Sequence, residues 1–156
     1  MSYYQEIVGE YLNSERSRFI SNEFLLDIGD PLAMTSGHAF WVDIAAVDFD
    51  RQTIFLCEVS YSRSLAAIRD KLRVWSARWE DVRAATFRAS KAPSKWAIMP
   101  WIFAPNERHD RFFRWFDAQG LKLPRPTWTD LECVAPWKRD DQGVRAMKEA
   151  GKADAD

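Results

Sequence analysis

The sequence predicts an α/β domain in which a central mixed sheet is flanked by helices. Three observations lead to this prediction: helix-like and strand-like segments alternate along the chain, the central strands are apolar on both faces, and 47% of the 156 residues are hydrophobic. Strands that are apolar on both faces are typical of a sheet covered by helices on either side. A chain of this length can bury one ordinary core. We therefore expect a single domain over residues 1–136 and a C-terminal helix or frayed tail over residues 137–156.

The first expected elements are one helix and three strands. Apolar residues recur at helical spacing from Tyr3 to Leu12, and Glu6 and Glu10 lie off that apolar face. Segments rich in β-formers and bounded by turn residues then predict three strands, at residues 22–29, 39–49 and 52–61. A loop with Gly, Pro and Ser separates the first of these strands from the second.

A long helix is expected next, over residues 64–89, with Ser64 as its N-cap. Its apolar stripe contains Leu65, Ile68, Leu72, Trp75 and Trp79. A fourth strand is expected at residues 95–105, and then a helix that Gly120 closes from the C-cap position. Residues 126–134 predict a last edge strand. The predicted order is therefore α-β-β-β-α-β-α-β.

Two carboxylates stand out in the apolar second and third strands. A tight turn at Asp50 and Arg51 pairs these strands so that Asp43 lies opposite Glu58 on one face, with Cβ atoms about 4.5–5.5 Å apart. Like charges in such a place destabilise the fold unless a shared proton, a cationic side chain or a divalent metal offsets them. Mg²⁺ or Mn²⁺ is therefore one expectation. The alternative is that the acids are solvent-exposed or form a salt bridge to Arg63 or Lys71.

These residues resemble the PD-(D/E)XK nuclease superfamily, also called restriction-endonuclease-like. The predicted order α-β-β-β-α-β is similar to the common core of that superfamily over residues 3–104. Asp43 matches the acid of its second core strand, and Glu58 matches the acid of the (D/E)-X-K tripeptide in the third. Glu6 is similar to a first-helix glutamate that some members add to the metal site. The resemblance implies an enzyme that hydrolyses phosphodiester bonds in DNA, with Asp43, Glu58 and Glu6 holding Mg²⁺ or Mn²⁺.

The chain departs from the family pattern at Ser60, which stands where the tripeptide has its catalytic lysine. That lysine helps to activate the attacking water and stabilises negative charge, and a serine hydroxyl carries no charge for this work. Some members move the role to the following helix, which makes Lys71 the candidate for a migrated lysine. The alternative is a catalytically inactive relative that binds nucleic acid or a protein partner.

Charge is distributed unevenly along the chain. Residues 1–62 contain 3 Lys/Arg and 10 Asp/Glu, whereas residues 63–95 contain 9 Lys/Arg and 3 Asp/Glu. The basic segment predicts that Arg63, Arg69 and Arg73 contact a nucleic-acid backbone, with DNA as the expected partner. Solvated charges on a helix surface are the alternative, and a homodimer remains open.

Other classes of protein are disfavoured. No apolar run approaches the ~20 residues needed to cross a bilayer, and the N-terminus has no targeting pattern, so we expect a cytoplasmic protein without membrane association. Cys57 and Cys133 lack a metal-site spacing, and the glycines form no recognised phosphate loop. His38 could contact a phosphate or the metal, or it could be an exposed loop residue.

Overall fold

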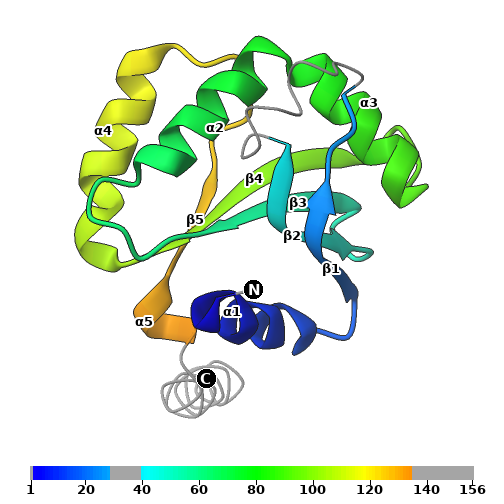
Figure 1. The fold of residues 1–156 in the computed structure, drawn as a ribbon. Helices are drawn as coiled ribbons and strands as arrows, with labels where there is room; N and C mark the ends of the chain where they lie inside the picture. The colour runs from blue at the N-terminus through cyan, green and yellow to red at the C-terminus, as the bar shows by residue number, and fades with distance from the viewer. Residues whose placement is uncertain (1, 29–39, 135–156) are drawn as a thin grey trace, which may run out of the picture.

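The structure is a computed structural model that describes residues 2–28 and 40–134. This part of the chain forms an α/β fold with a five-stranded mixed sheet, as the sequence predicted (Figure 1). The strands are β1 (Arg18–Leu25), β2 (Trp41–Asp48), β3 (Thr53–Val59), β4 (Ala97–Ala104) and β5 (Thr127–Asp130). The helices are α1 (Tyr3–Asn13), α2 (Ala66–Ala77), α3 (Trp79–Ser90), the 3-10 turn η2 (Asn106–Arg108), α4 (His109–Gln119) and α5 (Leu131–Val134). His38 and the predicted tail at residues 137–156 lie outside the described residues.

The strands lie in the sheet in the same order as in the chain. β1, β2 and β3 form an antiparallel meander, whereas β4 is parallel to β3 and β5 is parallel to β4. A parallel pair needs a crossover connection, and the segment with α2 and α3 provides one between β3 and β4. No helix in the described part of the chain is both long and apolar enough to span a membrane.

Helices cover both faces of the sheet, so the sheet separates two apolar cores. Figure 1 shows α2, α3 and α4 on one face, with α1 and α5 on the other. The first core includes Leu56, Leu72, Trp75, Ile102 and Phe112, and the second includes Val8, Leu12, Ile44, Cys57 and Phe103. The central strands are therefore buried on both faces, which explains why their sequences are apolar without alternation.

The predicted β2–β3 register is confirmed, from Ile44 opposite Cys57 to Asp48 opposite Thr53. The predicted alternation of faces is wrong at one end of β2: Val42 belongs to the core under α2, whereas Ile44 belongs to the core under α1. The neighbouring β1 changes faces at the same level, where Glu23 has a φ of 50°. This left-handed backbone conformation interrupts the regular pleat of β1.

The single helix predicted over residues 64–89 is wrong, because α2 and α3 are separate helices. Arg78 lies between them with φ −128° and ψ 34°, and its N–H donates to the carbonyls of Val74 and Trp75. The first turn of α3 contains Glu80 and Asp81, which favour a helix start because they face the positive end of the helix dipole. The apolar spacing continues across the break, so periodicity alone did not reveal it.

The start of α2 also differs from the prediction. Leu65, with a φ of 52°, is the N-cap residue rather than Ser64, whose hydroxyl accepts a hydrogen bond from the N–H of Ala66. In contrast, the predicted end of α4 is confirmed, because Gly120 adopts a left-handed φ of 61° directly after it.

Two strand boundaries were predicted incorrectly. β1 begins at Arg18 rather than near residue 22, and Arg18 forms a buried ion pair with Asp48 of β2 at 2.9 Å. The edge strand β5 ends at Asp130, and the following four residues form α5 instead of continuing the strand. α5 places Leu131 and Val134 in the core beneath the sheet, where α1 also packs.

Candidate functional site

The candidate site lies where β2 and β3 stop pairing. The regular ladder ends at Ile44 and Cys57, and beyond it the Asp43 side chain takes a position between the strands. Its Oδ2 accepts a hydrogen bond of 2.8 Å from the N–H of Val59, and its Oδ1 accepts one of 2.7 Å from Gln5 Nε2 on α1. The Asp43 carboxylate is thus fixed from two sides, by β3 and by α1.

Glu58 reaches toward the other face of the sheet, where α2 packs, so the prediction that Asp43 and Glu58 project from one face is wrong. The Glu58 residue is 3% exposed, and its carboxylate forms an ion pair of 2.5 Å with Lys71 through Oε2. Lys71 is also buried, and its ammonium donates a second hydrogen bond of 2.7 Å to the carbonyl of Trp41. The other carboxylate oxygen, Glu58 Oε1, is buried and has no hydrogen-bond partner among the described residues.

Burial dominates the electrostatics of Glu58. It raises the pKa of this carboxyl from 4.5 to about 8, because the charged form loses its hydration. The Lys71 charge lowers the pKa, the Asp43 charge raises it, and hydrogen bonds from Lys71 and from the Asp43 backbone N–H lower it. One nearby ammonium therefore does not fully compensate two carboxylates, and a further positive charge beside Glu58 would stabilise its ionised form.

The donor atoms fit a hard divalent cation. Mg²⁺ takes oxygen ligands from one or two carboxylates and keeps several waters, so a pair of acids is sufficient. Glu58 Oε1 has no hydrogen-bond partner among the described residues, and the charge of Asp43 acts on Glu58, but the two carboxylates point toward opposite faces of the sheet, so a shared ion would require one of them to turn. No group of three or more His, Cys, Asp or Glu suited to a metal occurs among residues 2–28 and 40–134.

The α1 residue that contacts Asp43 is Gln5, not Glu6. Glu6 is exposed and lines an open groove between α1 and β1, together with Glu10 and Asn22. Its role as a metal ligand stays a prediction. Gln5 was not predicted as a site residue because an amide carries no charge. Ser2 and Gln5 form a capping box at the start of α1, which is a pattern visible in the sequence.

The remaining predicted site residues lie around this centre. The hydroxyl of Ser60 hydrogen-bonds to the hydroxyl of Ser62 in the loop that follows β3, and Arg63 is exposed in the same loop. Arg69 and Arg73 lie on α2, and both guanidinium groups pack over the ring of Trp115 on α4. Lys71 is therefore the predicted cation that the structure brings into contact with Glu58, whereas Arg69 and Arg73 point toward α4.

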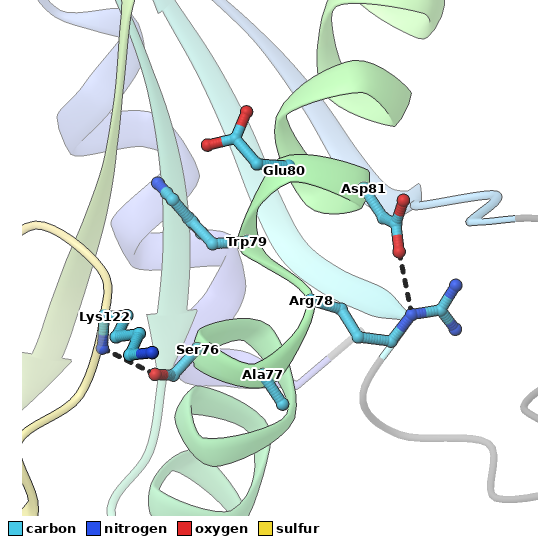
Figure 2. A pocket seen from close by; sticks show the side chains of 7 residues that line it. All are labelled: Ser76, Ala77, Arg78, Trp79, Glu80, Asp81 and Lys122. Carbon is cyan, nitrogen blue, oxygen red and sulfur yellow. Dashed lines mark hydrogen bonds and ion pairs between the residues drawn. The ribbon is translucent and has the colours of Figure 1, made fainter.

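A separate open pocket lies at the break between α2 and α3 (Figure 2). Arg78 pairs with Asp81 at 3.0 Å, and the backbone N–H of Lys122 donates to Ser76 Oγ. Trp79 and Glu80 complete the lining, together with Ala77. Because both signs of charge line this pocket, its chemistry favours no single class of charged ligand.

The fold and this site define an α/β protein with a buried carboxylate–lysine pair at the divergent end of an antiparallel strand pair. Comparison with known protein families, with curated proteins and with solved structures gives no match.

Proposed function

We propose that the protein is a metal-dependent phosphodiesterase that cleaves DNA and has a restriction-endonuclease-like fold. The observation that carries this proposal is the buried Glu58 carboxylate, which Lys71 contacts beside Asp43 where β2 and β3 diverge. The element order also supports it: one helix, three antiparallel strands, a helical crossover and a parallel strand follow one another as in the superfamily that the sequence resembles.

Asp43 and Glu58 would hold Mg²⁺ or Mn²⁺ through their carboxylate oxygens. When bound, such an ion lowers the pKa of a water and neutralises charge on phosphate oxygens, which phosphodiester hydrolysis requires. Gln5 and the Val59 N–H fix the orientation of Asp43, and the Lys71 charge favours the ionised, ligating form of Glu58. Lys71 thereby supplies the positive charge that Ser60 lacks, and Arg63 would contact the DNA backbone.

A second candidate function is DNA binding without cleavage. It is favoured by the hydrogen bonds that already occupy both oxygens of Asp43 and by the Lys71 ammonium on Glu58. In that case the carboxylates and Lys71 stabilise the end of the sheet, and the arginines of the basic segment provide the function.

A DNA cleavage assay with Mg²⁺ or Mn²⁺ separates the two candidates. We expect the wild type to cleave, and we expect Lys71→Met to slow cleavage by orders of magnitude, because a missing charge near the reacting phosphate costs several kcal/mol of barrier. Glu80→Gln removes an exposed acid of α3 and should cleave like the wild type.

Ser60→Lys tests the departure from the family pattern. If Lys71 does not replace the missing lysine, the wild type should be inert and Ser60→Lys should create metal-dependent cleavage. Mn²⁺ binding without cleavage in either protein would favour the binding function. If neither protein binds Mn²⁺ nor cleaves DNA, the nuclease proposal is wrong.

A further inference from the structure

Two arginines of α2 pack on one tryptophan of α4, and a third arginine, on α4, lies near them. The Cζ atoms of Arg69 and Arg73 each lie 5.2 Å from the ring centroid of Trp115. Arg111, one turn before Trp115 on α4, is near enough for its charge to act on Arg69. The cluster therefore combines side chains from two helices that are far apart in the sequence.

Little negative charge compensates this cluster. Arg73 pairs with Asp70 at 2.7 Å, but Arg69 and Arg111 form no ion pair with a carboxylate in the described part of the chain. The Nε of Arg69 is buried and has no hydrogen-bond partner among residues 2–28 and 40–134, and the same holds for Nε1 of Trp115. Burial, followed by the charges of Arg111 and Arg73, lowers the pKa of Arg69. A buried donor without a partner and a set of like charges both destabilise the fold, and a bound anion would relieve the repulsion between the charges.

We propose that Arg69 and Arg73, packed on Trp115, and the nearby Arg111 form a binding site for a phosphate-type oxyanion. Guanidinium groups bind tetrahedral oxyanions through paired N–H donors, and stacking on an aromatic ring leaves the edge of the guanidinium plane uncovered. Arg73 already donates to Gln119 and Asp70, so its second terminal nitrogen is the donor that would meet the anion. Trp115 holds the planes of Arg69 and Arg73 by cation–π contact, so less side-chain freedom is lost on binding.

The anion can come from the backbone of a nucleic acid or from a free phosphate. Both sources present the same oxygens, so the arginine cluster recognises either. The inference rests on the contacts of the cluster and not on the proposed metal chemistry, since Lys71 faces the sheet whereas Arg69 and Arg73 face α4. Binding in the presence of a metal chelator therefore tests it separately from the proposed function.

The test is a calorimetric titration of the protein with inorganic phosphate and, separately, with a short DNA duplex, at constant ionic strength and without divalent metal. The informative protein is the double variant Arg69→Gln/Arg111→Gln. Its matched control is Arg83→Gln/Arg88→Gln, which removes the same charge from α3. We expect the first variant to lose at least about tenfold in affinity, because two charged donors to the anion are removed, and the control to stay within about twofold.

The two ligands distinguish the two sources. Loss of duplex affinity assigns the site to backbone phosphates, and loss for inorganic phosphate alone assigns it to a free phosphate compound. The variant should also unfold at a temperature no lower than the wild type in phosphate-free buffer, because two uncompensated charges are removed. Equal affinities in the wild type and the first variant for both ligands, or no binding of either by the wild type, would overturn the proposal.

Discussion

In the wild type, the free energy of unfolding should depend on pH between about pH 5.5 and pH 8, and Glu58→Gln should remove this dependence. Burial raises the pKa of Glu58 to about 8 in the folded protein, against 4.5 for an ordinary glutamate. The folded state therefore binds this proton more tightly than the unfolded state does. The resulting stability is fully present below about pH 4.5 and is lost as the pH rises through about 8.

The size of the effect follows from these two pKa values. Proton linkage gives a fall of about 3 kcal/mol in the free energy of unfolding between about pH 5.5 and pH 8. The buried Asp48 does not contribute in this range. Burial raises its pKa, but hydrogen bonds from the Arg51 N–H and Arg18 and the charges of both arginines outweigh burial and leave it below 3.8. Asp48 is therefore ionised in both states throughout.

Urea unfolding of the wild type and of Glu58→Gln at several pH values measures this dependence. The other titrating groups contribute equally to the free energy of unfolding of both proteins, so their contributions cancel in the difference. The free energy of unfolding of the wild type minus that of Glu58→Gln should fall by about 3 kcal/mol from about pH 5.5 to pH 8. Saturating Mg²⁺ should restore part of the wild-type stability at pH 8, because a cation on Glu58 favours its ionised form. Parallel pH profiles for the two proteins would refute the reasoning about the buried carboxyl.

Other expected outcomes follow from single contacts. Lys71→Met should lower the free energy of unfolding at pH 8 by about 3 kcal/mol in urea unfolding, because it leaves a buried carboxylate without its cation; an unchanged midpoint would contradict this. Arg69→Ala combined with Arg73→Ala should reduce the slope of log affinity for DNA against log salt by about 2, and an unchanged slope would argue against backbone contacts. Gly120→Ala should cost about 1 kcal/mol in thermal unfolding, because φ is 61° there. Gly9→Ala should not destabilise the protein, because its Cβ would meet Ile20 at an ordinary 3.5 Å and alanine favours a helix.

Strong local patterns predicted most of the fold. The uninterrupted apolar segments of β2 and β3 and their tight turn fixed the hairpin register, and the Gly120 signal fixed the end of α4. The break at Arg78 was not predicted, because the apolar spacing from Trp75 to Val82 runs through it and no Gly or Pro marks it. The start of β1 at Arg18 depends on a partner thirty residues away in sequence, which local propensity does not register.

The sequence predicted which residues form the candidate site but not the directions in which their side chains point. The predicted register placed Asp43 beside Glu58, and the position of Lys71 on the following helix suggested a role near them. The change of face between Val42 and Ile44 turns Asp43 toward Gln5 and the Val59 N–H, while Glu58 faces α2. Strict strand alternation cannot anticipate such a change, which coincides with the left-handed residue Glu23 in the neighbouring strand.

Calorimetric titration with Mn²⁺ tests the central claim most directly, namely that Asp43 and Glu58 form a divalent-metal site. Wild type, Asp43→Asn, Glu58→Gln and the control Glu80→Gln should be compared at about pH 8, where Glu58 loses its proton more readily. The account predicts that the wild type and Glu80→Gln bind Mn²⁺ equally well and that each of the other two variants loses binding by at least about tenfold. Equal Mn²⁺ affinity in all four proteins, or no Mn²⁺ binding by the folded wild type, would contradict it.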